Sequence, residues 1–274
     1  MLFYYLSFMK NFPIGIFDSG IGGLTVAHAL KEKLPNESII YFGDTEHLPY
    51  GEKSDEAIQN FSKNIAEFLE KKNCKAIVIA CNSASSVAFD IVKKEAETIP
   101  VFNVIDPVVN EVTKNYAYCN IGVIGTKATI QSGIYTKKIR EICTSVKVSE
   151  IATPLLVPMI EEGFVNGDIS HKIIENYLSN KMLSNIDSLI LACTHYPLIY
   201  REIDDFYKNK TNVIDSADIV ANFIHSELKN LNLLNDGNNP ESHFYISNYT
   251  RNFEKSAQFF FQEDINIEEA NIWI

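Results

Sequence analysis

The chain has few cysteines, a deficit of positive charge and no long apolar run. Its 274 residues contain five cysteines, an odd number without the regular spacing of a disulfide framework, which is typical of a reducing compartment. Lys and Arg total 24 against 35 Asp and Glu, so no basic face of the kind that binds nucleic acid is expected. No segment approaches the roughly 20 apolar residues that cross a bilayer. These absences predict a cytoplasmic protein that binds neither membranes nor nucleic acid.

The sequence motifs of the common cofactors and of metal sites are also missing. There is no complete G-x-G-x-x-G, and "DSGIGGL" at residues 18–24 lacks the lysine and the spacing of a P-loop. No Cys-X-X-Cys pair is present, which disfavours a dithiol redox protein. Cys193 and His195 lie close together but have no compact set of further ligands, and zinc requires four. We expect no metal and no cofactor.

Residues 1–11 are interpreted as a flexible extension. The segment "MLFYYLSFMKNF" is apolar, but it has no basic leading region and no small-residue cleavage site, so it does not fit a secretory signal. Met9 is an alternative natural start, and the sequence alone does not distinguish the two.

Short apolar runs alternate with amphipathic helical patterns along the chain. Helices are predicted over residues 54–72, with Ser54 as N-cap, from about residue 168, and over 216–231. The faces expected to be buried include Ile169 in the second of these helices and Leu231 in the third. This alternation predicts an α/β protein with mostly parallel sheets covered by helices on both faces. The expected strands begin at Ile14, Ser38, Ala76, Val101, Ile121, Ser188 and Asn212.

Two patterns in the sequence occur twice. "PIGIFDSG" from Pro13 aligns with "NIGVIGTK" from Asn120 at an offset of 107 residues, and "IVIACNSASS" at residues 77–86 aligns with "LILACTHYPL" at residues 189–198 at an offset of 112. Because the two offsets are nearly equal, they predict two copies of a related α/β unit. Coincidence is the alternative, because such strand endings are common. The first unit is expected at residues 12–107 plus 223–274 and the second at residues 108–222, related by pseudo-twofold symmetry.

Each copy ends a buried strand with a cysteine, Cys81 in the first and Cys193 in the second. In doubly wound sheets, ligands bind beyond the carboxyl ends of the strands. If the two units face each other, the two sulfurs reach one ligand from opposite sides, which suits the removal of a proton from one face and its delivery to the other. Simple burial is the alternative for either cysteine alone.

Six segments, in order along the chain, resemble the glutamate racemases of the cofactor-independent aspartate/glutamate racemase superfamily. The similarity begins at about Pro13 and includes "HFYISNYTRNF", which resembles the closing strand and helix of the family. It implies two α/β domains with the active site in the cleft between them, cofactor-independent interconversion of L- and D-glutamate for peptidoglycan synthesis, and a homodimer. The six segments are "IGIFDSGIGGLTV", "YFGDTEHLPYGEKS", "IVIACNSAS", "IGVIGTKATIQSGIY", "LVPMIEEG" and "LILACTHYPLI".

The resemblance also implies catalytic roles. Cys81 matches the thiol that removes the α-proton of D-glutamate, and Cys193 matches the thiol that removes the α-proton of L-glutamate. A thiol needs help to act as a base at neutral pH, and we expect the N–H groups of the helix that follows Cys81 to favour its thiolate. Asp18 matches the group that assists the first thiol and His195 the group that assists the second. If the chain is locally extended, Cys193 and His195 point the same way.

A further acidic residue of the family matches Glu161, although the adjacent Glu162 makes a one-place error in this match an open alternative. The matching segments contain no arginine, so the substrate carboxylates are expected to meet hydroxyl, amide and backbone N–H groups. The residues that match the substrate contacts of the family are Asp18, Ser19, Tyr50, Gly51, Asn82, Ser83, Thr126, Thr129, Thr194 and His195.

The chain departs from the family at one point. It reads Cys81-Asn82-Ser83 where the family commonly has Cys-Asn-Thr, which keeps the hydroxyl and loses a methyl group. Two other functions stay open at this point. An aspartate racemase shares the two-thiol chemistry and differs in cleft size, and a catalytically inactive binding relative is expected to have lost a cysteine, which has not happened here.

Overall fold

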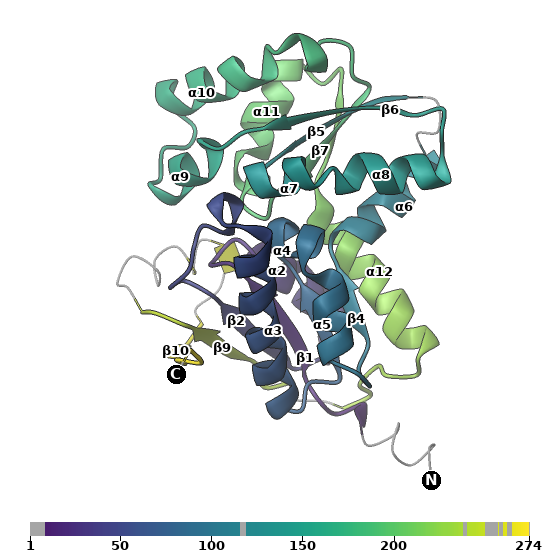
Figure 1. Ribbon diagram of the computed structural model, residues 1–274, viewed down its shortest axis with the longest axis vertical. Coiled ribbons are helices and arrows are strands. Elements are labelled where there is room, and N and C mark those ends of the chain that lie inside the picture. The colour runs from purple at the N-terminus through teal and green to yellow at the C-terminus, as the bar shows by residue number, and fades with distance from the viewer. Residues whose placement is uncertain are drawn as a thin grey trace.

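The computed structural model of the protein describes residues 9–115, 119–237, 240–249, 257, 260–261 and 265–273. They form two α/β lobes, each built on its own parallel sheet, which lie one above the other in Figure 1. The first lobe has a six-stranded sheet in the order β10-β9-β2-β1-β3-β4, and the second has a four-stranded sheet in the order β6-β5-β7-β8.

The first lobe alternates strands with helices along the chain. Its strands are β1 (Ile14–Asp18), β2 (Ile39–Gly43), β3 (Ala76–Ile79), β4 (Val101–Asn103), β9 (His243–Ile246) and β10 (Ile267–Glu269). Its helices are α2 (Leu24–Lys33), the short 3₁₀ helix η1 (Tyr50–Glu52), α3 (Asp55–Lys71), α4 (Asn82–Val87) and α5 (Phe89–Glu95).

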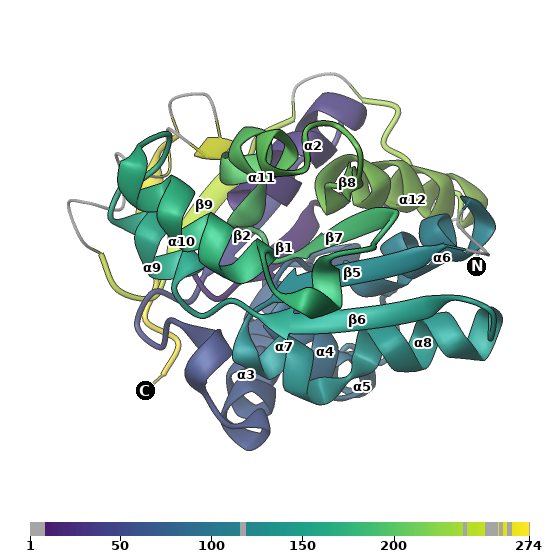
Figure 2. The ribbon, with the colours of Figure 1, turned by 90° about the horizontal axis from the view of Figure 1, so that it is seen from above.

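The second lobe follows the same plan. Its strands are β5 (Asn120–Gly125), β6 (Lys147–Ala152), β7 (Ser188–Ala192) and β8 (Asn212–Ile214). Its helices are α7 (Lys127–Ser132), α8 (Ile134–Ile142), α9 (Leu156–Glu161), α10 (Asp168–Leu178), η2 (Lys181–Leu183), η3 (Tyr196–Ile199) and α11 (Tyr200–Tyr207). Seen from above, β6, β5 and β7 lie side by side, with α7 and α8 on one side of the sheet and α11 on the other (Figure 2).

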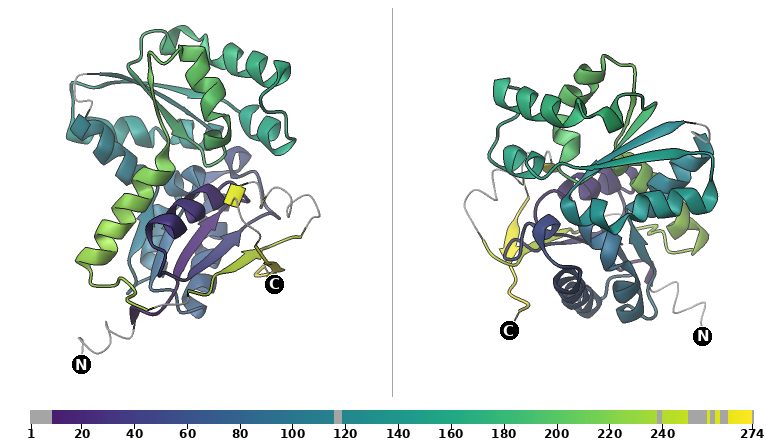
Figure 3. Two further views of the ribbon diagram at one scale, coloured as in Figure 1. Left: turned by 180° about the vertical axis from the view of Figure 1, so that it is seen from behind. Right: turned by 45° about the horizontal axis from the view of Figure 1, so that its top comes forward.

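Two helices connect the lobes. The helix α6 (Ile105–Asn115) lies at their junction, and α12 (Ser216–Asn230) runs from the junction along the first lobe, where it packs against α2 and α6 (Figure 3). The chain therefore crosses between the lobes on one side of the molecule. The domain boundaries expected from the sequence stay a prediction.

The strand order repeats between the lobes. In the first sheet, β2-β1-β3-β4 are neighbours, and in the second, β6-β5-β7-β8 are neighbours, so β1 to β4 correspond in position to β5 to β8. All the strand pairs are parallel in the described part of the chain. The expected α/β fold with two similar units is confirmed, and the two sequence repeats correspond to equivalent strands.

The strands β1, β2 and β3 of the first sheet are buried on both faces, which explains their continuous apolar sequences. Ile16 belongs to the hydrophobic cluster that α2 and α12 complete, whereas its neighbour Phe17 belongs to the cluster that α3, α4 and α5 complete. Successive side chains of a strand point to opposite faces, so a strand that is covered on both sides has no polar alternation.

All seven expected strands are present, and three further strands were not predicted from apolar runs. The strand β6 is partly exposed at the edge of its sheet, and its sequence "KVSEIA" has no continuous apolar run. The strand β9 lies in the segment that resembles the closing strand of the family, whereas residues 250–253 of that segment lie outside the described residues.

Of the expected helices, α3 is confirmed in detail, because the Ala57 N–H donates to the Ser54 hydroxyl at 3.3 Å. Two expected core residues are wrong. Ile169 is 54% exposed, because the buried face of α10 is made by Ser170, Ile174 and Leu178. Leu231 is 42% exposed because α12 has ended.

The start of the described chain is held by a buried ion pair. The Lys75 ammonium contacts the Glu37 carboxylate and donates to the Lys10 carbonyl at 2.6 Å, and Glu37 also accepts from the Asn235 N–H at 2.8 Å. Met9 is buried nearby in the core. Residues 9–11 of the expected extension therefore have defined contacts, and residues 1–8 lie outside the described residues. No helix in the described part of the chain has the length and apolar composition needed to span a membrane.

Cys74 packs directly beneath β1. A Cβ atom at Gly15 would lie 2.9 Å from the Cys74 sulfur, so this strand position accepts only glycine without rearrangement. Burial raises the pKa of the Cys74 thiol to about 12, because a thiolate would lose its hydration there.

This burial predicts a pH-dependent stability. Between about pH 9 and pH 12 the unfolded chain ionises Cys74 and the folded chain does not, so the free energy of unfolding falls by up to ~1.4 kcal/mol per pH unit from this group. Cys74→Ala should show a correspondingly shallower decline in urea unfolding at pH 8, 9 and 10. Cys119→Ala, at a partly exposed cysteine, is the matched control and should keep the wild-type decline. An unchanged decline in Cys74→Ala would contradict the assignment.

Candidate active site

A small cavity of about 30 Å³ lies between the lobes, at the carboxyl ends of their strands. Ten of the thirteen site residues expected from the sequence line it, and Pro49 and Val157 complete its wall. The ten are Ser19, Tyr50, Gly51, Cys81, Asn82, Ser83, Thr126, Cys193, Thr194 and His195.

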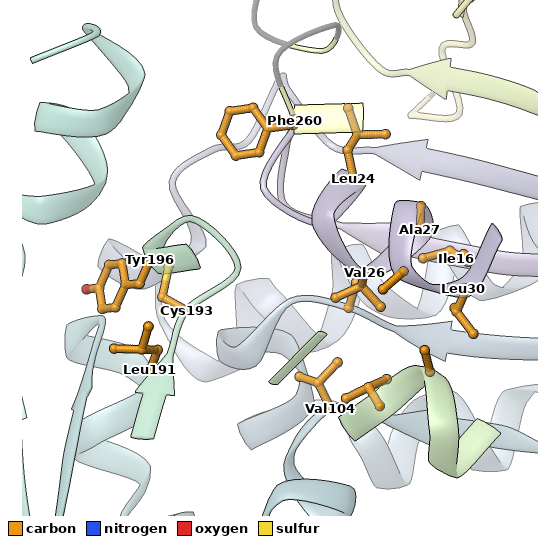
Figure 4. Close-up of a cluster of buried hydrophobic side chains, with 14 of the residues drawn as sticks. Ile16, Leu24, Val26, Ala27, Leu30, Val104, Leu191, Cys193, Tyr196 and Phe260 are labelled. Carbon is orange, nitrogen blue, oxygen red and sulfur yellow. The ribbon is translucent and has the colours of Figure 1, made fainter. Parts of the chain in front are cut away.

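The two cysteines reach the cavity from different lobes. Cys81 follows β3 and is the N-cap of α4, and Cys193 follows β7, where Figure 4 shows it beyond the end of the strand that carries Leu191. Because β3 and β7 occupy equivalent places in the two sheets, the repeated fold brings equivalent thiols to one cavity. Each cysteine is 5% exposed.

The Cys81 thiol is held in its protonated form. Burial, with a smaller contribution from the nearby Asp18 carboxylate, raises its pKa to about 12, whereas the Ala84 N–H at the start of α4 acts in the opposite direction. The helix start was expected to favour a thiolate, and the loss of hydration outweighs it. The thiol lies 3.7 Å from the Ser19 hydroxyl, to which it donates.

Asp18 ends β1 behind the cavity wall and is completely buried. Its carboxylate accepts hydrogen bonds from the Gly20 N–H at 3.0 Å and from the Thr194 hydroxyl at 3.4 Å. Burial raises the pKa of Asp18, while the charge of His195 acts against that rise. Asp18 does not line the cavity, and its charge interacts with Cys81 and with His195.

Cys193 has a different environment. The Nδ1 atom of His195 lies 3.8 Å from the Cys193 sulfur, and Nε2 lies 3.0 Å from a Glu161 oxygen. Burial disfavours the charged imidazole, but the hydrogen bonds with Cys193 and Glu161 outweigh it and raise the pKa of His195 to about 10. A protonated imidazole therefore faces the second sulfur.

The geometry of this pair corrects one expectation. The chain at Cys193 is not extended, since His195 has φ −82° and ψ −27° within a turn that leads into η3. The turn nevertheless brings the imidazole to the sulfur. Of the two adjacent acidic residues, Glu161 is the one that contacts His195, at the end of α9.

Hydroxyl groups join the lobes across the cavity. Ser83 in α4 shares a hydrogen bond with Thr126 at 2.9 Å, and Thr126 donates to Thr129 at 3.1 Å. Thr126 is also the N-cap of α7, where it accepts from the Thr129 N–H. Thr129 is buried and does not line the cavity, so it supports Thr126 from behind.

The loop between β2 and α3 forms another wall. The Tyr50 hydroxyl donates to the buried Asp44 at 2.7 Å, and Asp44 also accepts from Ser247 at 2.8 Å. A Cβ atom at Gly51 would lie 2.6 Å from the Thr126 Cβ, so glycine allows the loop to meet the opposite lobe.

Sequence reasoning missed Asp44, Ser247, Pro49 and Val157. Asp18 ends β1 and Asp44 directly follows β2, and an acidic residue at the end of a strand was the available signal for Asp44. Ser247 is separated from Asp44 by 203 positions in the sequence, and no local pattern links the two. Within the described ranges, no group of three His, Cys, Asp or Glu side chains is arranged to hold a metal ion.

The His195 contacts predict a specific titration. In histidine-labelled protein followed by NMR, the His195 imidazole should stay protonated at pH 8 and titrate at about pH 10. Glu161→Gln should lower this pKa, because it removes the negative charge beside Nε2. Glu162→Gln is the matched control and should leave the titration unchanged. Equal titration in the wild type and in Glu161→Gln would contradict the assigned contact.

Comparison with known proteins is consistent with this geometry. Residues 24–224 match the model of the Asp/Glu/Hydantoin racemase family. The chain is 40% identical over 265 residues to glutamate racemase 3 from Caldanaerobacter subterraneus subsp. tengcongensis, with 96% of each chain covered. It is 40% identical over 252 residues to the glutamate racemase of Aquifex aeolicus, with 92% of this chain and 95% of the other covered.

A solved structure gives the same result. The glutamate racemase of Francisella tularensis, in complex with D-glutamate, superposes with a TM-score of 0.91 at 41% identity, covering 96% of this chain and 99% of that one. Similarity of this extent in both sequence and structure covers both lobes and the cavity between them. The chain therefore belongs to the Asp/Glu/Hydantoin racemase family and is one of its glutamate racemases.

Proposed function

We propose that this protein interconverts L- and D-glutamate by a two-thiol reaction that requires no cofactor, with Cys81 and Cys193 as the two acid/base groups. The observation that carries the proposal is the meeting of both thiols on one cavity from opposite lobes. The relatives at 40% identity are glutamate racemases, and one solved relative binds D-glutamate.

The two thiol environments suggest how the reaction starts from L-glutamate. Cys193, as a thiolate beside the imidazolium of His195, removes the α-proton, and the electron pair of the broken C–H bond stays on the substrate. Cys81, held as a thiol by burial, delivers its proton to the opposite face of the α-carbon. The product is D-glutamate, with Cys81 now a thiolate and Cys193 a thiol. The reverse reaction exchanges these roles.

His195 and Glu161 together stabilise the negative charge on the Cys193 thiolate. The imidazolium compensates the charge of the thiolate, and Glu161 compensates the charge of the imidazolium. Asp18, on the other side, favours a neutral Cys81. This asymmetry gives the resting site one base and one acid, which is what a single turnover from L-glutamate needs.

Neutral donors are suited to the two carboxylates of the substrate. Among the described residues that line the cavity there is no arginine or lysine, and hydrogen-bonding groups take their place. Hydroxyls of Ser19, Ser83, Thr126 and Thr194 and the amide of Asn82 are the candidate contacts. Hydrogen bonds to a carboxylate are charge-assisted and are stronger than those between neutral groups.

The lobes must separate for glutamate to enter. A volume of about 30 Å³ accommodates about two water molecules, whereas glutamate has ten non-hydrogen atoms. The contacts that open are those that cross the cavity, including Gly51 against Thr126 and the exposed Glu52–Lys127 ion pair at 2.9 Å. Exposed ion pairs are weak, so this one permits opening at small cost.

We also propose that the protein works in the cytoplasm as a homodimer and supplies D-glutamate for peptidoglycan. The racemase family and the excess of acidic residues support a small-molecule enzyme without a nucleic-acid partner. Light scattering on the purified full chain tests the dimer: twice the chain mass of 31.0 kDa is expected.

The two-thiol reaction predicts solvent exchange. In heavy water, the D-glutamate first formed from L-glutamate should carry deuterium at the α-carbon, because the delivered proton comes from a thiol that exchanges with solvent. Proton NMR of the product measures this. Product that retains the original hydrogen would rule out transfer by two separate groups. Parallel incubation with L-aspartate tests the alternative substrate.

Removal of either thiol should affect both directions. Cys81→Ala and Cys193→Ala should each lower kcat/KM by about 10²–10⁴-fold from L- and from D-glutamate, because each thiol is the base in one direction and the acid in the other. Circular dichroism of the reaction measures both directions. Cys119→Ala, outside the cavity, is the matched control and should retain wild-type activity. Near-normal turnover of either active-site variant would refute the assignment.

A further inference from the structure

The amide of Asn82 has one satisfied end and one free end. Asn82 is the first residue of α4, is 2% exposed and lines the cavity. Its Oδ1 atom accepts a hydrogen bond from the Tyr135 hydroxyl at 2.7 Å. Its Nδ2 atom is buried and has no hydrogen-bond partner among the residues that the structure describes. A buried donor without a hydrogen bond lowers the stability of the folded chain, so its presence here points to a functional role for Nδ2.

The hydrogen bond from Tyr135 determines which end of the amide is free. A separation of 2.7 Å is typical of an O–H···O bond and is shorter than the usual N–H···O bond, so the hydroxyl pairs with the amide oxygen. Burial raises the pKa of Tyr135, which keeps its hydroxyl protonated as a donor. With Oδ1 engaged, Nδ2 is the group left for the cavity.

Tyr135 acts from behind the site and from the other lobe. It lies in α8, is buried in the hydrophobic cluster with Val123 and Ile139, and does not line the cavity. Asn82 belongs to the first lobe, so this hydrogen bond crosses the junction. It forms only when the lobes are together, which links closure of the site to the orientation of the amide.

We propose that Tyr135 is a positioning residue that holds the Asn82 amide with Nδ2 directed at an acceptor oxygen of the bound amino acid. The proposal rests on the glutamate racemase function proposed above. Without the Tyr135 hydroxyl, the amide is free to rotate and to present its oxygen to the anionic substrate, which is repulsive. Loss of the hydroxyl therefore weakens substrate binding and leaves the two thiols in place.

Tyr135→Phe tests this inference, because it removes one oxygen and keeps the ring in its apolar cluster. The expected result is a KM about tenfold higher for both L- and D-glutamate, with kcat within about twofold of the wild type. Tyr245→Phe, at a buried tyrosine in β9 whose hydroxyl accepts from Lys72, is the matched control and should leave both constants unchanged. An unchanged KM in Tyr135→Phe would overturn the proposal.

A double-mutant cycle separates positioning from a general structural effect. In an Asn82→Ala background, Tyr135→Phe should change KM no further, because the group that it positions is gone. A second tenfold increase in that background would show that Tyr135 acts by another route. Thermal unfolding of all the variants accounts for loss of folded protein.

NMR of the Asn82 side-chain amide tests the orientation independently of turnover. Tyr135→Phe should shift the Nδ2 resonances relative to those of the wild-type protein, whereas identical resonances in the two proteins would overturn the proposal. If the wild type fails to racemise glutamate while this shift is observed, the proposed function fails and the positioning hydrogen bond is retained.

Discussion

Parallel strands bring their carboxyl ends to one edge of a sheet, and in this protein the two sheets turn those edges toward each other. Asp18 ends a strand at one of these edges, and Cys81, Thr126 and Cys193 each follow a strand there. The chain crosses between the lobes at α6 and α12 on one side, which leaves the rest of the junction to be closed by side-chain contacts. The cavity and its lining both depend on this arrangement.

The two cysteines occupy equivalent places in the repeated fold, but the charged groups around them differ. Both cysteines are equally buried, but Cys81 faces the charge of Asp18 whereas Cys193 faces the imidazole of His195. Burial reduces the screening of these charges, so two equivalent positions in a repeated fold have different electrostatic environments. Burial also makes an unpaired amide at Asn82 costly, and the positioning role proposed for Tyr135 follows from this cost.

Sequence patterns predicted correctly those features that depend on residues close together in the chain. Apolar runs predicted the buried strands, and Ser54 predicted the start of α3. They failed for β6, which lies at a sheet edge and needs no continuous apolar run, and for Ile169, whose exposure depends on which face of α10 meets the second lobe. Most of the site residues were recognised through the family resemblance, and Asp44 and Tyr135 were missed as supporting residues because their partners lie on other elements.

The sequence by itself determined the α/β class, the repeat and the identity of the two thiols, because strand periodicity and short motifs are properties of neighbouring residues. Tertiary structure alone decided the protonation of Cys81, the contact of Glu161 with His195 and the hydrogen bond between Tyr135 and Asn82. These depend on burial and on distances between residues far apart in the chain, which no local pattern records.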